Sequence, residues 1–345
     1  MNIKTVGVCA AALVLTCSIA RVAPAEADDV AAFYKGKNAR LIISTGTGGG
    51  YDAYGRLLAQ YLGRHIPGTP NFVPQNMTGA GGIRATNFMY HNAPKDGSVI
   101  AVVHSAMTTA SLLTPEKVEF DSSKLNWIGN MDSESSLCVS WHTSPIKTTQ
   151  DMLTKQFIVG GSGAGSNMEI YPRVINEILG AKIKVISGYK GGKRVALAME
   201  QGELQGRCSW PLSAIRKAHP DWLKSKKLNL LLQTGLEKNP ELPNVPLIVD
   251  FVKNDDDRAV VELIFAARSF LRPVLAPPNV PAERIAALRN AFDATVADKK
   301  FQADAERRGM PLSPIKGQSM QGQILKIYRT PKSTVERARK IMGSK

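Results

Sequence analysis

Three glycine-rich loops, each following a short apolar run, constrain the fold of this chain more than any other feature. The apolar runs are Leu41-Ile42-Ile43, Phe72-Val73 and Phe157-Ile158-Val159, and each loop leads into a stretch with helical spacing of apolar residues. This alternation of strand, loop and helix is typical of α/β proteins with parallel sheets, which is the fold class we predict. The loops read Gly46-Thr47-Gly48-Gly49-Gly50, Gly79-Ala80-Gly81-Gly82 and Gly161-Ser162-Gly163-Ala164-Gly165-Ser166.

The N-terminus has the pattern of an export signal. Lys4 precedes an apolar run from Val6 to Ala20, and small residues follow at Ala23, Ala25 and Ala27. We therefore predict that residues 1–27 are a cleaved signal peptide and that the mature protein lies in the periplasm. An N-terminal membrane anchor left in place is the alternative.

The length of the remaining chain predicts two lobes, because residues 28–345 exceed what one hydrophobic core usually serves. We assign 28–131 together with 235–345 to the first lobe and 132–234 to the second. Two helical stretches, 282–297 and 318–338, close the chain. Pro331 is expected to kink or split the second of them.

Cysteine and charge limit the possible partners. Cys9 and Cys17 belong to the signal, so Cys138 and Cys208 remain, either as a disulfide permitted by an oxidising compartment or as two buried thiols. The net charge of +15 is dispersed along the chain. It favours an anionic ligand or an anionic surface nearby. Export and the lack of a compact basic helix argue against nucleic acid as a partner.

The glycine loops suggest anion binding. Glycine allows the backbone to turn several N–H groups inward, and the first N–H groups of a helix have no partner within the helix. A carboxylate or phosphate is favoured at such a place. Ser166 and Asn167 can cap the third helix or contribute a hydroxyl and an amide to the ligand. Tight turns without a ligand are the alternative interpretation of each loop.

The enzyme patterns do not fit. Gly48 to Gly55 lacks the acidic residue of a dinucleotide site, Gly192-Lys193-Arg194 is no phosphate loop, and Gly160 to Ala164 ends in alanine where a hydrolase elbow needs glycine. The five histidines lack metal spacing. We therefore predict no catalytic residue, no metal and no cofactor. His104, at a strand end before Ser105, is the one histidine that we consider a possible ligand contact.

Several motifs occur together in one order. Asp52 and Arg56 follow the first loop, Gln75-Asn76-Met77-Thr78 precedes the second, and Pro94-Lys95-Asp96-Gly97, Tyr189-Lys190-Gly191-Gly192 and Leu242-Pro243-Asn244-Val245-Pro246 come later. In this order they resemble the Bug-type receptors of tripartite tricarboxylate transporters. Lys95 is inserted in the third motif relative to the family pattern. The resemblance runs from about residue 40 to residue 338.

The resemblance implies a type II periplasmic binding protein: two α/β lobes, a hinge and a ligand cleft between them that closes like a Venus flytrap. It implies a small organic acid as ligand, membrane permease subunits as partners, and a monomer. One carboxylate would be held by backbone N–H groups and waters of the first lobe, and loops of the second lobe would close over the other end. The residues carried over are Thr47, Gly48, Tyr51, Asp52, Gly79, Ala80, Gly81 and Ser105 in the first lobe, and Gly163, Ala164, Gly165, Ser166, Asn167 and Lys190 in the second. Asp52 with Arg56 can instead stabilise the first helix and its loop.

One departure from the family concerns the ligand. Many members carry an acidic residue, able to take an amino group, where this chain reads Arg207-Cys208-Ser209-Trp210. We therefore predict a di-, tri- or aromatic carboxylate without an ammonium group, whose second carboxylate meets Arg207 or Ser209. A surface position for Arg207 is the alternative, because side chains alternate along a strand. The predicted function is a solute-binding protein for uptake by a tripartite transporter. The alternatives are a periplasmic ligand sensor and, less favoured, a periplasmic enzyme on the same fold.

Overall fold

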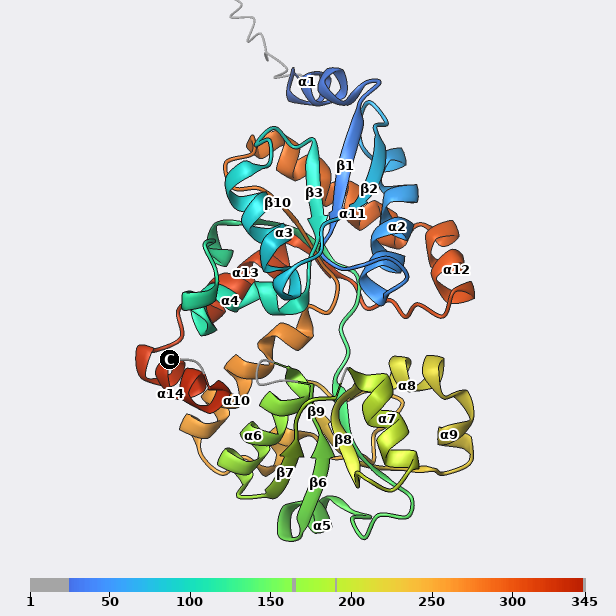
Figure 1. Cartoon of the computed structure of the whole chain (residues 1–345). Coiled ribbons are helices and arrows are strands. Elements are labelled where there is room, and N and C mark those ends of the chain that lie inside the picture. Colours follow the sequence, from blue (N-terminus) through green and yellow to red (C-terminus); the bar gives the residue numbers. More distant parts are fainter. Residues whose placement is uncertain (1–24, 163–165, 190, 344–345) are drawn as a thin grey trace, which may run out of the picture.

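The computed structural model describes residues 25–162, 166–189 and 191–343, and Figure 1 shows them as two lobes, one above the other. The first lobe contains a six-stranded sheet in the order β11-β4-β10-β3-β1-β2. Strand β1 pairs in parallel with β2 and β3, and β10 pairs antiparallel with β3 and β4. The strands are β1 Asn38–Ile43, β2 Asn71–Asn76, β3 Val99–Val102, β4 Asn126–Asn130, β10 Pro273–Ala276 and β11 Ile315–Lys316.

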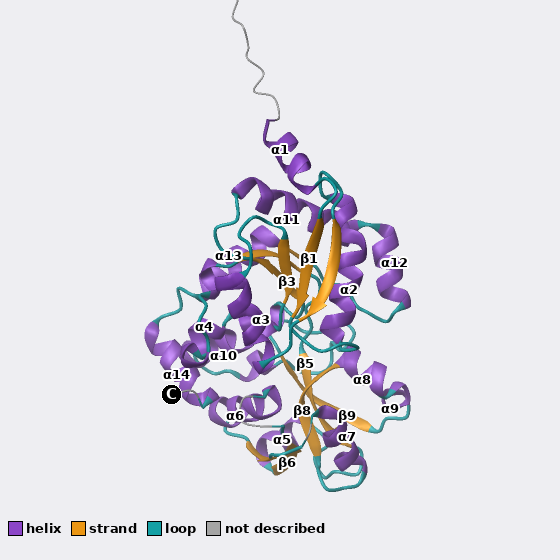
Figure 2. Cartoon of the chain, turned by 45° about the horizontal axis from the view of Figure 1, so that its top comes forward, coloured by secondary structure: helices purple, strands orange, loops and turns teal. Residues whose placement is uncertain are grey.

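Both faces of the first sheet are covered by helices, as Figure 2 shows. Because neighbouring side chains of a strand point to opposite faces, Leu41 and Ile43 pack in one cluster with Leu57 and Phe292, while Ile42 packs in another with Trp127. The parallel α/β arrangement is therefore as predicted. The helices of this lobe are α1 Ala25–Tyr34, α2 Gly50–Leu62, α3 Ile83–Asn87, α4 Ala110–Leu113, α11 Ala282–Ala297, α12 Lys299–Arg307 and α13 Gly317–Ile327.

The second lobe contains a five-stranded sheet in the order β7-β6-β8-β5-β9. Strand β6 runs parallel to β7 and β8, whereas β5 runs antiparallel to β8 and β9. A disulfide between Cys138 on β5 and Cys208 on β8 joins two neighbouring strands, so the structure supports pairing over two free thiols. The elements are β5 Ser136–Trp141, α5 Thr149–Thr154, β6 Gln156–Gly160, α6 Asn167–Leu179, β7 Lys182–Ile186, α7 Gly192–Glu200, β8 Gly206–Pro211, α8 Leu212–Ala218, α9 Pro220–Lys224, β9 Leu228–Thr234, α10 Asp255–Phe265 and α14 Lys332–Met342.

The chain crosses between the lobes three times: after β4, between α10 and β10, and between α13 and α14. Pro331 caps the start of α14, so it splits the last helical stretch as predicted. The predicted lobe boundary at 234/235 needs correction, because α10 and α14 pack on the second sheet. Val261, Phe265 and Ile341 bury their side chains in one cluster with Phe157 of β6. An amphipathic pattern shows that a helix has an apolar face, but not which sheet covers it.

Residues 1–24, and with them most of the predicted signal peptide, lie outside the described part, and α1 begins at Ala25. Within the described ranges, no helix is long and apolar enough to cross a membrane.

Candidate functional site

The first glycine loop is held by the helix that follows it. Asp52, the third residue of α2, is 4% exposed. Its Oδ2 accepts a hydrogen bond from the Gly48 N–H at 2.9 Å, and its Oδ1 accepts from Arg56 Nε at 2.9 Å and from Asn76 Nδ2 at 2.8 Å. Burial alone would raise the pKa of Asp52, but the hydrogen bonds from Arg56, Asn76 and Gly48 outweigh it and hold this pKa below its usual value. This arrangement agrees with the role of Asp52 and Arg56 as supports of the loop.

The second glycine loop has an unusual backbone. Gly79, Ala80, Gly81 and Gly82 all have positive φ, at 145°, 45°, 65° and 104°. Only glycine adopts such angles at little cost, so Ala80 is a strained residue of the kind that clusters at binding sites. The first three residues are exposed. Successive N–H groups in backbone of this type form concave sites for anions.

Tyr51 and His104 connect the two loops. The Tyr51 hydroxyl accepts a hydrogen bond from the Ser105 N–H at 3.0 Å, and its ring stacks on His104 at 5.2 Å. A Cβ on Gly82 would lie 3.2 Å from the His104 Cβ, so that glycine allows the close approach. Burial, and then the charges of Arg268 and Arg272, lower the pKa of His104 to about 4. The imidazole is therefore neutral at physiological pH, and its Nδ1 accepts from the Ala106 N–H at 3.3 Å.

The start of α6 in the second lobe offers a polar group without a partner. Ser166 is its N-cap residue but makes no capping hydrogen bond, and its Oγ is buried with no partner among the described residues. Asn167 follows as the first residue of the helix. The other predicted contacts of this loop, Gly163, Ala164 and Gly165, and also Lys190, lie outside the described residues.

Glu169 lies in the first turn of α6 and was not predicted from the sequence. It is the third residue of α6, its Oε1 accepts from the Ser187 hydroxyl at 2.7 Å, and its Oε2 lies 3.5 Å from Arg173. It also packs where a side chain on Gly161 would stand. The available signal was an acid with an arginine four residues later, directly after a glycine loop, as at Asp52.

Arg207 is half-buried and lies beside the start of α7. Its Nη1 donates to the Gly192 carbonyl at 3.3 Å, and its guanidinium lies 4.4 Å from the centre of the Trp210 ring. Burial lowers the pKa of Arg207 to about 10, and its Nε is buried without a partner. Burial alternates along β8, with Arg207 and Ser209 half-buried and Cys208 and Trp210 buried, although the β5–β8 register shifts and Ser209 has φ of 64°. Arg207 is therefore half-buried rather than fully exposed, and its contact with a ligand stays a prediction.

The two lobes meet near these residues. Tyr171, one turn into α6, is buried, and burial raises its pKa to about 12, with smaller opposing effects from Arg268 and Tyr51. Tyr51 belongs to the first lobe and Arg268 to the second crossing. The Tyr171 ring packs on Phe265 of α10, 4.6 Å between the ring centres, shortly before the crossing that carries Arg268.

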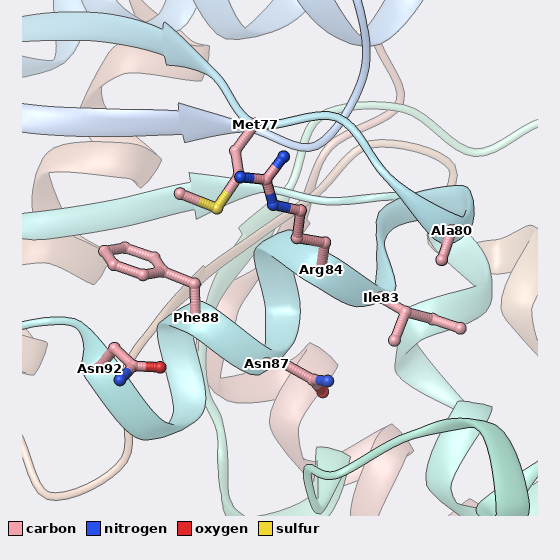
Figure 3. Close-up of a pocket in the computed structure, with 7 residues that line it drawn as sticks. All are labelled: Met77, Ala80, Ile83, Arg84, Asn87, Phe88 and Asn92. Atoms are coloured by element: carbon pink, nitrogen blue, oxygen red, sulfur yellow. The ribbon is translucent and has the colours of Figure 1, made fainter.

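Two hollows border this region. A pocket of about 460 Å³ lies on the outer side of α3, and Figure 3 shows Ala80, Ile83 and Phe88 among its lining residues. A groove of about 1450 Å³ runs between the lobes. It is lined by the crossings at Glu134 and Arg268, by Ser213 of α8, and by the segment 308–316. Of the predicted contacts that the structure describes, Ala80 lines the pocket and none lines the groove.

The chain is similar to a known family of transport receptors. The family model of the tripartite tricarboxylate transporter family receptor matches residues 58–325. No curated protein is similar enough in sequence to count as a match. Among solved structures, a TctC solute-binding protein from Polaromonas, without ligand, is 16% identical with a TM-score of 0.67, and the match covers 90% of this chain and 99% of that one.

Two further solved structures carry ligands. An R. palustris protein with adipate is 18% identical with a TM-score of 0.63, and the match covers 89% of this chain and 98% of that one. MatC from Rhodopseudomonas palustris, with bound malate, is 17% identical with a TM-score of 0.58, and the match covers 89% and 99%. At these identities the likeness shows the two-lobed periplasmic binding-protein fold.

Proposed function

Because the chain belongs to the tripartite tricarboxylate transporter receptor family, we propose that it captures a small organic carboxylate in the periplasm for uptake by such a transporter. The ligand we propose is a di-, tri- or aromatic carboxylate without an amino group. The membrane permease subunits of the transporter are the proposed partners. The proposed contacts are those of the two glycine-loop helices and their neighbours, together with Arg207 and Ser209.

The observation that carries this proposal is the backbone of the two glycine loops in the first lobe. The exposed positive-φ loop at Gly79–Gly81 lies beside the start of α2, and Asp52 ties the first loop down before any ligand arrives. Backbone that is ordered in advance costs less entropy on binding. A negatively charged group is favoured at a helix start and at a concave row of N–H groups. Thr47, Gly48, Gly79, Ala80, Gly81 and Ser105 are therefore the contacts that we propose for one carboxylate.

The second lobe supports a ligand with a second acidic group. It places Arg207, rather than an acid, beside the start of α7, and the Ser166 hydroxyl at the start of α6 has no partner among the described residues. A guanidinium binds a carboxylate with two parallel hydrogen bonds, whereas an ammonium group would be repelled. The adipate and malate of the two relatives are consistent with this class of ligand.

Closure follows from the division of the contacts between the lobes. Contacts to both lobes form together only when the lobes come together around the ligand, so binding shifts the equilibrium toward the closed form. The permease would then recognise that closed form. A sensor would bind the same ligand but would not support uptake.

A thermal-shift screen followed by calorimetry tests the ligand class. The panel is succinate, malate, adipate, citrate and phthalate, with glutamate and aspartate as amino-acid counterparts. We expect at least one acid of the first group to raise the melting temperature, because a ligand that binds only the folded state stabilises it. Tight binding of glutamate or aspartate without any response to the other acids would overturn the proposal. Uptake of the bound acid by vesicles that contain the permease subunits separates transport from sensing.

A further inference from the structure

Arg272 lies at the end of the second crossing, directly before β10, and extends beneath the first glycine loop. Its guanidinium is 4.5 Å from the centre of the Tyr51 ring and 4.9 Å from that of Tyr54. A Cβ on Gly50 would lie 3.0 Å from Arg272 Nη2, so the absence of a side chain at Gly50 leaves room for this group. The arginine therefore lies at the first residue of α2.

The guanidinium of Arg272 has unused hydrogen-bonding capacity. Nη1 donates to the Leu271 carbonyl at 3.0 Å, which is the one hydrogen bond of this guanidinium within the described ranges. Its Nε is buried without a partner, and it forms no ion pair with a described residue. A buried guanidinium nitrogen without a partner is costly, so an anion that accepts its hydrogen bond would relieve that cost.

A second arginine adds to the positive charge of the crossing. Arg268 is 7% exposed, one of its nitrogens donates to the Glu134 carbonyl at 2.8 Å, and its Nε is buried without a partner. The carboxylate of Glu134 is occupied elsewhere, since it accepts from the N–H and hydroxyl of Ser213 at 2.9 Å and 2.5 Å. Asp132 is the other nearby acid, and burial raises its pKa to about 7. Within the described ranges, neither acid forms an ion pair with Arg268 or Arg272.

The start of α2 supplies the second part of the site. Gly49 is the N-cap residue and makes no side-chain cap, and the first backbone bond of the helix runs from the Ala53 N–H to the Gly49 carbonyl. The N–H groups of Gly50 and Tyr51 thus lack partners within the helix. Nη2 of Arg272 lies 3.0 Å from the place of a Cβ on Gly50, at this end of the helix. A carboxylate at this position can accept hydrogen bonds from both the backbone and the guanidinium.

We propose that Arg272, together with the first turn of α2, binds one carboxylate of the ligand, and that the protein selects dicarboxylates because Arg207 receives the other. This inference rests on the proposed function and narrows it. Backbone and water alone would tolerate many anionic groups, whereas a guanidinium held between two tyrosine rings fixes a planar carboxylate in one orientation. The stacking also orders the arginine in advance, so that little side-chain entropy is lost on binding.

Calorimetry with matched ligands and variants tests this site. The probes are succinate, malate, adipate and phthalate, each compared with its monomethyl ester. For the wild-type protein we expect the best diacid to bind at least about tenfold more tightly than its ester. Arg272→Gln should weaken that diacid by about 10- to 100-fold, the range for hydrogen bonds to a charged group, and Arg272→Lys should weaken it less. Arg329→Gln removes the same charge from an exposed position of the third crossing, between α13 and α14, and should leave binding unchanged.

The possible outcomes distinguish failure of the role of Arg272 from failure of the proposed function. A wild-type protein that binds none of the four diacids overturns both. Wild-type binding that persists within about twofold in Arg272→Gln, or equal binding of diacid and ester, overturns only the role of Arg272. If Arg272→Gln does not fold, Arg272→Lys with the diacid–ester comparison decides the question, because a purely structural arginine would leave the preference for the diacid intact.

Discussion

The starts of α2 and α6 share one arrangement of charged residues, built with acids of different length. Each helix follows a glycine loop, carries an acid at its third residue and an arginine four residues later: Asp52 with Arg56, and Glu169 with Arg173. Asp52 is short and binds its own loop at the Gly48 N–H. Glu169 is longer and binds Ser187, in the segment that follows the neighbouring strand. Asp52 also accepts from Asn76 at the end of β2, so both acids connect the start of their helix to a neighbouring strand or to the segment that follows it.

The two regions also differ in how they are reinforced. In the second lobe a disulfide joins β5 to β8, next to Arg207, and the described part of the first lobe has no such link. The first lobe instead has the stack of Arg272 on Tyr51 and Tyr54. The difference suggests that the first lobe carries a site formed in advance, and that the second lobe provides a stable body that closes on it.

We expect the largest effect on stability from Asp132, a carboxylate that lies at neither helix start. Asp132 lies in the first crossing, and burial raises its pKa to about 7, against the lowered pKa of Asp52. Its proton is bound more tightly in the folded state, so its contribution to stability is full below about pH 4 and is lost as the pH rises through about 7. The Asp132→Asn variant has no carboxyl group to ionise, so its stability should not fall in this way as the pH rises. Urea unfolding from pH 4 to pH 8 should show the variant gaining about 3 kcal/mol on the wild type; parallel curves would contradict the assignment.

Removal of the disulfide tests whether it stabilises the second lobe independently of the first lobe. Replacing both Cys138 and Cys208 by alanine should lower the free energy of unfolding of the second lobe by about 3 kcal/mol. Three of the four tryptophans, Trp141, Trp210 and Trp222, lie in that lobe, so fluorescence during urea unfolding reports on it. The same substitutions in a Trp127→Phe background remove the signal of the first lobe. An unchanged midpoint would show that the bond contributes nothing there.

The loop anchors can be compared directly. Asp52→Asn should cost about 2 kcal/mol of stability, because it weakens the charged hydrogen bonds to Gly48, Asn76 and Arg56. Glu169→Gln should cost less, since its pair with Arg173 is longer, at 3.5 Å against 2.9 Å. Urea denaturation of both variants measures the difference. Equal or reversed costs would remove the distinction between the two helix starts.

The smallest effect concerns the space beneath the first loop. Gly50→Ala should weaken binding of the best diacid only a few-fold, because its Cβ meets the movable end of Arg272 at 3.0 Å. Helix propensity should keep its melting temperature at or above that of the wild type. Gly322→Ala in α13 is the matched control, since a Cβ there meets nothing within 4 Å. Equal calorimetric affinities for the two variants would place Arg272 away from the ligand.

Local patterns predicted much of the fold. The apolar runs before the glycine loops became β1, β2 and β6, and the stretch 282–297 is α11 with the same bounds. The loops themselves could be located because closely spaced glycines after an apolar run are typical of strand-to-helix turns. The assignment of α10 and α14 failed because burial against one sheet or the other depends on contacts distant in sequence.

The charged part of the site was harder to predict. Arg268 and Arg272 lie in the mainly apolar stretch 264–275, more than 200 residues after the loop at Gly50. Two arginines four residues apart in an apolar segment were the available signal. Alternation along β8 holds at Arg207, but it could not show that the start of α7 and the Trp210 ring lie against this arginine, because those contacts are tertiary features.

Hydrogen–deuterium exchange with and without the tightest-binding diacid tests the central claim most directly. If the ligand is held between the lobes, amides in the first turns of both α2 and α6 should exchange more slowly when it is bound, while the distant helix α12 should not change. Protection confined to α2, or absent from both helix starts, would contradict a site shared by the two lobes.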